Sequence, residues 1–429
     1  MGIVPSLDVL RNATPAQLEQ AAAYNHRELF CLEATARGGE VCTNAGLTWT
    51  YAGPDHAGMV AFPALPDERA GLLLDEMMAW YRAHPPRGAG CWSLYPPLPA
   101  DIGVRLLARG FQPGWWPCWM ALDLANIRHH PNPPGLQVLA DNSLSTLPVQ
   151  DLPYGGDEGA VSPAFIAAHP ERVQRFIAVL DGNIVGHSCV LFSTGPYGAA
   201  GIYNVGVVPA MRRRGIGKAV VLAACRYAQE LGYHYAVLNA TGRRMYQQVG
   251  FQWISDGRTW WLQTSRFITH PPTPDQVALA EAVGRGDLPA LEGPGSLFNS
   301  NDLNRPITNG MTLVELAVHC RQPAAAQWLM DHGAACTPLA AWDLGWKDRA
   351  AALLAADPAA VNHLYGHLQN TLLHIAAERN DVALAQLALA ARPNLQLKDK
   401  VYNGTPLDWA LHFQRAAITR LIQAQMDAS

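Results

Sequence analysis

Lysine is scarce in this sequence, and long apolar runs are missing. Only four of its 31 lysines and arginines are lysines, a bias typical of GC-rich bacterial genes. No apolar run reaches the length needed to cross a bilayer, and the first residues lack a basic stretch followed by an apolar one. We therefore expect a soluble protein of the bacterial cytoplasm with no membrane partner.

Paired cysteine spacings and an excess of positive charge are also missing. The eight cysteines are scattered, which predicts reduced, buried thiols and no zinc site. The net charge of −4 and the isoelectric point near 6.4 argue against a broad nucleic-acid surface, because such a surface is markedly basic. We expect no metal and no nucleic-acid partner.

Two common nucleotide-binding motifs are absent as well. A P-loop needs a longer glycine spacing followed by Lys and Ser or Thr, and a dinucleotide fold needs three glycines with an acidic residue about 20 positions later. The chain instead has an apolar, β-branched run at 201–208, then Pro209, and then Arg-Arg-Arg-Gly-Ile-Gly-Lys at 212–218. This order predicts a strand, a Gly-rich turn and a helix that begins at the second glycine.

The turn at residues 212–218 has the features of an anion site. The first turn of a helix has backbone N–H groups without partners, and the aligned peptide dipoles add partial positive charge there. Glycines without Cβ let an anion reach the backbone, and three arginines and Lys218 strengthen the positive field. The sequence therefore predicts a binding site for a pyrophosphate, which we call the phosphate cradle.

Downstream residues extend the pattern. Residues 235–239 read as the next strand, which ends at Asn239, and Tyr246 lies just before Gly250 and Phe251. Strand, turn, helix, strand, Asn, Tyr and Gly-Phe in this order resemble the acetyl-CoA-binding motif of the GNAT superfamily of N-acetyltransferases.

The resemblance implies acetyl-CoA as the cofactor and a set of site residues. In this family, the Asn at the end of the strand contacts the cofactor. The Tyr of the short helix commonly protonates the departing thiolate of coenzyme A, which implies a catalytic role for Tyr246. The implied cofactor-binding residues are Val207, Val208, Arg212, Arg213, Arg214, Gly215, Ile216, Gly217, Lys218 and Asn239.

The general base stays unassigned at this point. Many family members use a Glu on the strand that enters the cofactor turn, but here that strand offers Tyr203 and Asn204. Deprotonation through ordered water is one alternative, and three side chains are others: His187, Asp157 and Glu158. For each of these side chains we expect a structural role before a catalytic one.

Local patterns outside the motif predict further elements. Thr14, Pro15 and Gln17 predict a helix that opens with a capping box. Residues 141–171 are expected to hold two helices and a loop that shape the acceptor side. Asp-Gly-Asn at 181–183, between two apolar runs, predicts a hairpin.

Residues 1–130 repeat part of the order seen around the motif. A helix ending in Arg-Gly-Phe at 109–111 precedes an aromatic strand, as Val-Gly-Phe at 249–251 precedes residues 260–262. This part therefore looks like a degenerate second GNAT copy. It lacks the arginine and glycine turn, so we expect no cofactor there. An unrelated α+β domain is the alternative.

Past residue 266 the sequence becomes rich in Ala and Leu and shows an internal repeat. Thr337, Thr371 and Thr405 follow one another at intervals of 34 residues, each before Pro-Leu or Leu-Leu, which resembles the ankyrin repeat. His374 is expected to tie neighbouring turns by hydrogen bonds. The repeats imply recognition of a protein partner or another subunit, or a stabilising appendage to the enzyme.

The predicted fold class is an α/β (α+β) GNAT fold with two GNAT-like halves, followed by an all-α ankyrin-repeat solenoid. The expected domains are 1–130, a degenerate GNAT-like domain; 131–268, the catalytic GNAT domain; and 275–429, the ankyrin repeats. The expected activity is acetyl transfer to a primary amine of a small molecule, such as an aminated antibiotic or metabolite, by direct attack in a ternary complex. A protein acetyltransferase and an ankyrin interaction module with a cofactor-sensing GNAT domain are the alternatives.

Overall fold

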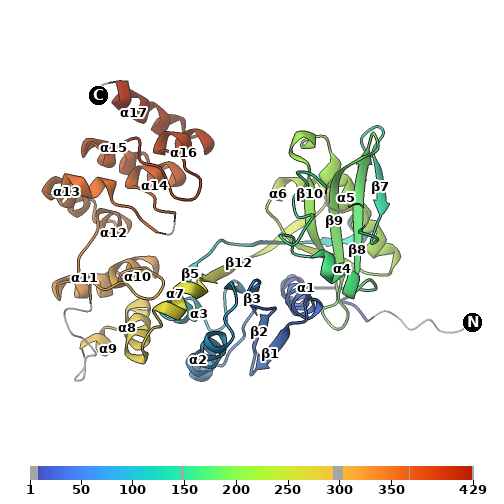
Figure 1. Ribbon diagram of the computed structural model, residues 1–429, viewed down its shortest axis with the longest axis horizontal. Coiled ribbons are helices and arrows are strands. Elements are labelled where there is room, and N and C mark those ends of the chain that lie inside the picture. Colours follow the sequence, from blue (N-terminus) through green and yellow to red (C-terminus); the bar gives the residue numbers. More distant parts are fainter. Residues whose placement is uncertain (1–7, 145, 147–148, 293–302, 367, 428–429) are drawn as a thin grey trace, which may run out of the picture. The chain divides into compact units, whose positions relative to one another are not determined.

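The computed structural model describes residues 8–144, 146, 149–292, 303–366 and 368–427, and the chain divides into two compact units (Figure 1). The first unit contains the residues up to Leu106 together with Phe111–Thr269. The second contains Leu107–Gly110 together with the residues from His270 onward. No helix in these described ranges is both long and apolar enough to cross a membrane.

The first unit opens with helix α1 (Pro15–Ala36). The predicted capping box is confirmed, because Thr14 Oγ1 accepts a hydrogen bond from Gln17 N–H and the Gln17 side chain accepts one from Thr14 N–H. The elements that follow in this half are β1 (Glu40–Asn44), β2 (Leu47–Tyr51), β3 (Ala57–Ala61), α2 (Asp67–Ala83), β4 (Gly88–Leu94), α3 (Ile102–Ala108), β5 (Phe111–Pro113) and β6 (Cys118–Asp123).

The second half of this unit contains the sequence motif. Its elements are β7 (Gln137–Ala140), α4 (Pro163–Ala168), β8 (Val173–Leu180), β9 (Asn183–Phe192), β10 (Ala200–Val207), α5 (Ile216–Glu230), β11 (Tyr235–Asn239), α6 (Arg243–Val249), β12 (Gln252–Leu262) and α7 (Thr264–Thr269). The predicted hairpin is confirmed as β8 and β9, which pair around Asp181 and Gly182, both with positive φ. The helix after the turn begins at Ile216, one residue before the predicted start.

One prediction for this half was wrong. Residues 141–171 were expected to contain two helices, but their described part contains only α4, a helix of six residues capped by Ser162. Turns and bends occupy the stretch before it. Glycines at 155, 156 and 159 explain this outcome, because glycine disfavours a continuous helix.

A single sheet joins the two halves. Within the described residues it has twelve strands, in the order β1-β2-β3-β4-β12-β6-β11-β10-β9-β8-β7, with β5 paired to β12. The halves exchange their last strands: β6 of the first half pairs antiparallel with β11, whereas the end of β12 pairs with β4 and β5. The exchange makes the two halves one continuous hydrogen-bonded structure.

Two apolar clusters support this sheet at the motif. One lies under α5, where Val221, Ala224 and Cys225 pack against residues of β10 and β11 such as Ile202 and Leu238. The other contains residues of α1 together with aromatic residues of β4 and β6. Burial of one face of α5 fixes the position of its N-terminus relative to the ends of the strands.

The second unit consists of helices. They are α8 (Pro274–Arg285), α9 (Leu288–Glu292), α10 (Leu313–His319), α11 (Pro323–Asp331), α12 (Pro338–Asp343), α13 (Lys347–Ala356), α14 (Leu372–Arg379), α15 (Val382–Ala390), α16 (Pro406–His412) and α17 (Ala416–Asp427). From α10 onward they contact one another in successive pairs, and α14 and α15 also contact α16 and α17. Stacked pairs of this kind share one core, which here includes Leu373, Leu384 and Trp409.

Threonines at equivalent positions start the first helix of each pair. Thr337 and Thr405 each cap a helix through their side-chain oxygen, and Thr371 forms a capping box with His374. The expected structural role of His374 is confirmed: its Nδ1 contacts Thr371 Oγ1 at 2.9 Å, and its Nε2–H donates to Gly404 O at 3.0 Å. This histidine is fully buried and joins two neighbouring turns.

Candidate functional site

The two parallel strands of the motif separate toward their carboxyl ends. β10 and β11 are paired only at Ala200 with Ala236 and Gly201 with Val237. Beyond these pairs β10 has a bulge between Tyr203 and Gly206, and Asn204 takes a positive φ of 50°. Within the described sheet, the carboxyl half of β10 therefore has no partner on its β11 side.

The phosphate cradle begins where β10 ends. Gly215 precedes α5 with φ of 87°, a conformation that favours glycine, and its carbonyl accepts the first helical hydrogen bond from Ala219 N–H. No side chain caps the helix. A Cβ on Gly217 would come no closer than 3.7 Å to Val207 and 3.9 Å to Met245, so packing does not require glycine at this position. A bare helix terminus with an open glycine fits a pyrophosphate.

The charged side chains of the cradle are available to a ligand. Arg212, Arg213 and Arg214 are exposed, and Lys218 is half-buried in the first turn of α5. The backbone just after β10 is less available to a ligand than these side chains. Val208 N–H donates to Val185 O at 3.0 Å and so already has a partner. The cradle's anion donors must therefore come from the turn and the helix, not from the Val208 amide.

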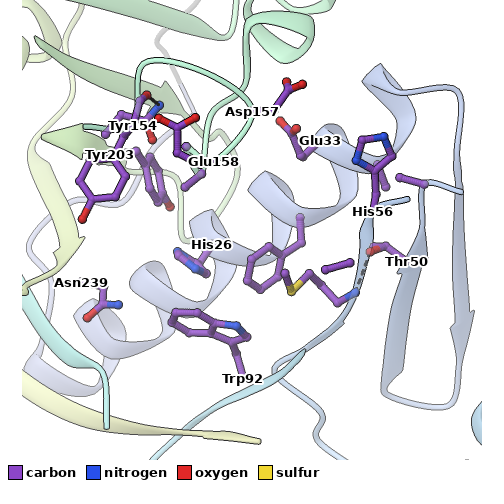
Figure 2. A pocket seen from close by; sticks show the side chains of 18 of the residues that line it. His26, Glu33, Thr50, His56, Trp92, Tyr154, Asp157, Glu158, Tyr203 and Asn239 are labelled. Carbon is purple, nitrogen blue, oxygen red and sulfur yellow. Dashed lines mark hydrogen bonds between the residues drawn. The ribbon is translucent and has the colours of Figure 1, made fainter. Parts of the chain in front are cut away.

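A cavity of about 610 Å³ lies in the same unit and contains the other two predicted residues, Asn239 and Tyr246 (Figure 2). Four parts of the chain line it: α1, the β2–β4 side of the first half, the loop before α4, and the strands β10 and β11 with α6. The charged and polar lining residues are His26, Glu33, Arg37, Thr50, His56, Arg87, Asp157, Glu158, Asn204, Asn239 and Thr241. The aromatic ones are Phe30, Trp92, Trp115, Tyr154, Tyr203 and Tyr246.

Tyr246 and Asn239 are held in place by the fold. Tyr246 is only 6 % exposed, and burial raises its pKa to about 12, with the neighbouring Tyr154 as a second cause. Its hydroxyl therefore stays protonated at neutral pH and can donate a proton. The amide oxygen of Asn239 accepts from Cys118 N–H at 3.1 Å, which leaves its NH₂ group for a ligand.

Sequence reasoning missed the contribution of α1. His26, Phe30, Glu33 and Arg37 lie on the face of this helix that lines the cavity, at spacings of three or four residues. That spacing was a usable signal, because a helix face that mixes aromatic and charged residues is unlike a pure core face. The motif that revealed the cradle lies almost 200 positions away in the chain, so nothing local connected the two.

Arg37 joins α1 to the loop before α4. Its guanidinium donates to Glu33 Oε1 at 2.7 Å and to Asp157 Oδ1 at 3.2 Å, and it lies 3.4 Å from Nδ1 of His56. Glu33 in turn accepts from Ser162 N–H at 3.3 Å. The carboxylates of Glu33 and Asp157 are therefore both paired with one cation.

Two buried histidines of the first unit, His26 and His187, are neutral at neutral pH. Burial lowers the pKa of His26 to about 3, and its ring packs among aromatic side chains, with the Trp92 centroid at 4.8 Å and the Tyr203 centroid at 5.5 Å. Burial lowers the pKa of His187 to about 4, and its Nε2–H donates to Pro153 O at 2.7 Å. His187 does not line the cavity, so its hydrogen bond supports the structural role that was expected.

Comparison with known proteins finds a family match for the part of the chain that contains the phosphate cradle, Asn239 and Tyr246. Residues 142–251 match the model of the acetyltransferase (GNAT) family. Over 174 residues the chain is 29% identical to a mycothiol acetyltransferase of Pseudarthrobacter chlorophenolicus, a match that covers 37% of this chain and 45% of that protein. The chain thus spans less than half the length of this curated relative.

Solved structures with low sequence identity also match part of this chain. A GCN5-related N-acetyltransferase from Kribbella flavida is 14% identical, with 56% of this chain and 95% of that chain covered and a TM-score of 0.43. A tandem GNAT protein from the clavulanic acid biosynthesis pathway is 13% identical, with 59% and 97% covered and a TM-score of 0.39. On the family model, residues 142–251 are an acetyltransferase domain of the GNAT family.

Proposed function

We propose that this chain is an acetyl-CoA-dependent N-acetyltransferase that acts on the primary amine of a small molecule. The observation that carries the proposal is the cavity: Tyr246 and Asn239 line it, and they come from the two elements that follow the phosphate cradle. Its volume of about 610 Å³ lies within the usual range for small-molecule sites. Walls from both halves favour a small acceptor over a lysine on a protein surface.

Different residues of the site would serve different parts of the acetyl transfer. Acetyl-CoA supplies an activated acetyl group, and the N-terminus of α5 with the arginines of the cradle would bind its pyrophosphate. Asn239 would bind the pantetheine arm through its NH₂ group. Tyr246, kept protonated by burial, would donate a proton to the thiolate as the acceptor amine attacks directly in a ternary complex.

The domain organisation is also a proposal. The first half repeats the order of parallel strand, helix and parallel strand in β3, α2 and β4, which supports a degenerate GNAT-like copy at 1–130 beside the catalytic domain at 131–268. The stacked helix pairs and the capping threonines support ankyrin repeats at 275–429. We assign to these repeats the recognition of a protein partner or another subunit.

The test is a titration of the chain with acetyl-CoA, followed by a screen of primary amines that monitors release of the coenzyme A thiol. We expect binding at a single site and transfer to at least one small amine. Absence of acetyl-CoA binding would refute the proposal. Binding without transfer to small amines, but with acetylation of a protein captured by the second unit, would favour the protein acetyltransferase.

A further inference from the structure

We propose that Glu158 binds the ammonium group of the acceptor and removes its proton, and that the acceptor amine is carried on an aromatic body. This inference rests on the proposed function and names the base and the acceptor class for the same site. It assigns a role that the family motif leaves open in this chain, because the motif strand has Asn204 where a carboxylate is common.

The charges around the cavity single out Glu158. Three carboxylates line it, and two of them, Glu33 and Asp157, are hydrogen-bonded to Arg37. Among the described residues, Glu158 forms no hydrogen bond or ion pair and remains exposed in the cavity wall. A carboxylate without a cation of its own is the group in this wall that can attract an ammonium ion.

The loop that contains Glu158 is fixed against β10. The side chain of Asn204 donates to Val161 O at 2.7 Å and to Tyr154 O at 3.3 Å, and it accepts from Val161 N–H at 3.2 Å. Gly159 lies flat on the same amide, because a Cβ there would approach Asn204 Nδ2 to 2.7 Å. Residues 154–161 are thereby held at the bulge where β10 leaves β11.

The attachment of this loop uses the residue that stands on the motif strand. Asn204 uses both ends of its amide to bind the loop, which a glutamate at this position would not do, since a carboxylate has no N–H to donate. Tyr154 starts the same loop segment and is close enough to Tyr246 to raise its pKa. Figure 2 shows Glu158 on the side of Tyr154 and Tyr203, whereas Asp157 lies toward Glu33 and His56. The proposed base and the proton donor thus come from a loop and a helix that line the same cavity.

The other titratable groups nearby are less suited to this task. His26 is neutral with a low pKa, which makes it a weak base. The Tyr203 hydroxyl donates to Asn25 Oδ1 at 2.6 Å, and His187 uses its ring proton on Pro153. The side chain of Glu158, by contrast, is exposed in the cavity wall and has no hydrogen-bond partner among the described residues.

The body of the acceptor is indicated by the rings in the cavity wall. Phe30, Trp92, Trp115 and Tyr154 come from four different parts of the first unit and all line the cavity. Aromatic side chains favour flat apolar groups, and their negative ring faces attract cations. An arylalkylamine matches both the rings and the free carboxylate.

The proton balance of the step is as follows. The ammonium loses one proton to Glu158, which passes it to water through the open cavity. The amine nitrogen then forms a bond to the acetyl carbon as the carbon–sulfur bond breaks. The second proton leaves the nitrogen to the ionised Glu158, and Tyr246 gives its own proton to the sulfur and recovers one through solvent. One ammonium and one thioester thus give an amide, a thiol and one released proton.

The first test measures binding with the full chain saturated with coenzyme A. Tyramine is titrated beside tyrosol, which has the same ring and chain length but a hydroxyl in place of the amine. We expect Glu158→Gln to weaken tyramine binding about tenfold and to leave tyrosol within about twofold. Asp157→Asn, the adjacent carboxylate that is paired with Arg37, is the matched control and should leave the ratio of the two affinities unchanged.

The second test measures transfer of the acetyl group to tyramine. Glu158→Ala is expected to lower kcat about 100-fold, with acetyl-CoA affinity within about twofold of the unmodified chain. Added formate should restore part of this rate in Glu158→Ala and none in Tyr246→Phe, because a small carboxylate replaces only the missing base. A merely structural loss would not respond to formate.

The remaining outcomes would overturn the role of Glu158, the acceptor class or the proposed function, each separately. Equal weakening of tyramine and tyrosol, or full activity of both Glu158 variants, would remove Glu158 from the mechanism. Failure of the unmodified chain to bind tyramine would overturn the aromatic acceptor class. Failure of the chain to bind acetyl-CoA would instead overturn the proposed function itself, so the two failures are distinguishable.

Discussion

The two halves of the first unit contain the same local order, a strand, a helix and a parallel strand, with opposite consequences. In the first half β3 and β4 pair at five consecutive positions from Ala57 to Ala61, and Phe62 N–H continues the ladder to Trp92 O. In the second half β10 and β11 pair at two positions only. One pair of strands is therefore closed at its carboxyl end, and the other leaves a gap for a ligand.

The helices that follow differ in charge as well. The first turn of α2 contains Asp67 and Glu68, which suit the helix dipole but would repel a phosphate. The first turn of α5 follows three arginines and Gly215 and contains Lys218. The same backbone order thus gives an anion site only where the residues before the helix are basic and small. We therefore expect the sequence at the turn, and not the order of elements, to decide which half binds the proposed cofactor.

The largest expected effect is a loss of acetyl-CoA affinity when one acidic residue is introduced into the phosphate cradle. Gly217→Asp places a Cβ and a negative charge in the cradle, and we expect acetyl-CoA affinity to fall more than about 100-fold. The fold should tolerate the change, because the Cβ has room and an acidic residue suits a helix N-terminus. Calorimetric titration and thermal unfolding of the same variant measure the two properties.

A control in the first half sharpens the result. Glu68→Gly, at the exposed start of α2, should leave acetyl-CoA affinity within about twofold. If Glu68→Gly weakens acetyl-CoA binding as much as Gly217→Asp does, then the first half binds the cofactor too and the contrast between the halves is wrong.

Tyr246 gives the next largest effect, and the first half has no tyrosine on the corresponding helix α3. We expect Tyr246→Phe to lower kcat about 100-fold while acetyl-CoA affinity stays within about threefold. Since burial raises the pKa of Tyr246 to about 12, its proton donation should persist up to about pH 11. Rate measurements from pH 7 to 11 test both statements, and a loss of rate with a midpoint well below pH 11 that is absent in Tyr246→Phe would contradict the second.

Tyr203→Phe is the matched control for this prediction. Its hydroxyl is also buried in the cavity wall but donates to Asn25, so its loss should lower the free energy of unfolding and leave kcat within about threefold. A similar fall of kcat in both variants would point to general disturbance of the cavity instead of proton donation by Tyr246.

Much of the second half was predictable because its signals are local. The strand, the glycine turn, the helix and Asn239 follow one another within about forty positions, and residues 235–239 form β11 with the predicted bounds. Helix caps were equally readable, as Thr14 with Gln17 shows, because a capping box depends on residues three positions apart. Interactions between residues that are close in the sequence can therefore be recognised from the sequence itself.

The cavity was not predictable for the opposite reason. His26 and Glu33 meet Tyr246 only because α1 packs across the joined sheet, and no pattern within the motif refers to α1. The exchange of β6 and β12 between the halves was also invisible, since either strand could have closed its own half. The role proposed for Glu158 depends on three hydrogen bonds of Asn204, which only the folded chain reveals.

Asn25 tests how far the first half stabilises the second. It lies on α1, and its NH₂ group reaches Leu191 O, Ser193 Oγ and Ala199 O of the β9–β10 hairpin at 3.0 to 3.1 Å. Asn25→Leu would remove these buried hydrogen bonds and leave the Tyr203 hydroxyl without its acceptor, so we expect a loss of about 2–3 kcal/mol in the free energy of unfolding. Denaturant unfolding measures it.

A half-buried asparagine of the same half, with its hydrogen bond at the surface, provides the comparison for this change. Asn44→Ala removes a hydrogen bond to Glu76 at the surface and should cost less than about 0.5 kcal/mol. Equal costs for Asn25→Leu and Asn44→Ala would mean that α1 contributes little to the stability of the hairpin.

The last prediction is a pH dependence of stability to which each half contributes one histidine. Burial lowers the pKa of His26 to about 3 and that of His187 to about 4, whereas an unfolded histidine has a pKa near 6.5. The unfolded chain therefore binds protons that the folded chain does not, so stability is complete above pH 6.5 and falls as the pH drops toward 4. Each histidine should contribute about 1.4 kcal/mol per pH unit within this window. His187→Gln should remove one of the two contributions, and an unchanged slope between pH 6.5 and 5.5 would show that His187 is protonated in the folded chain.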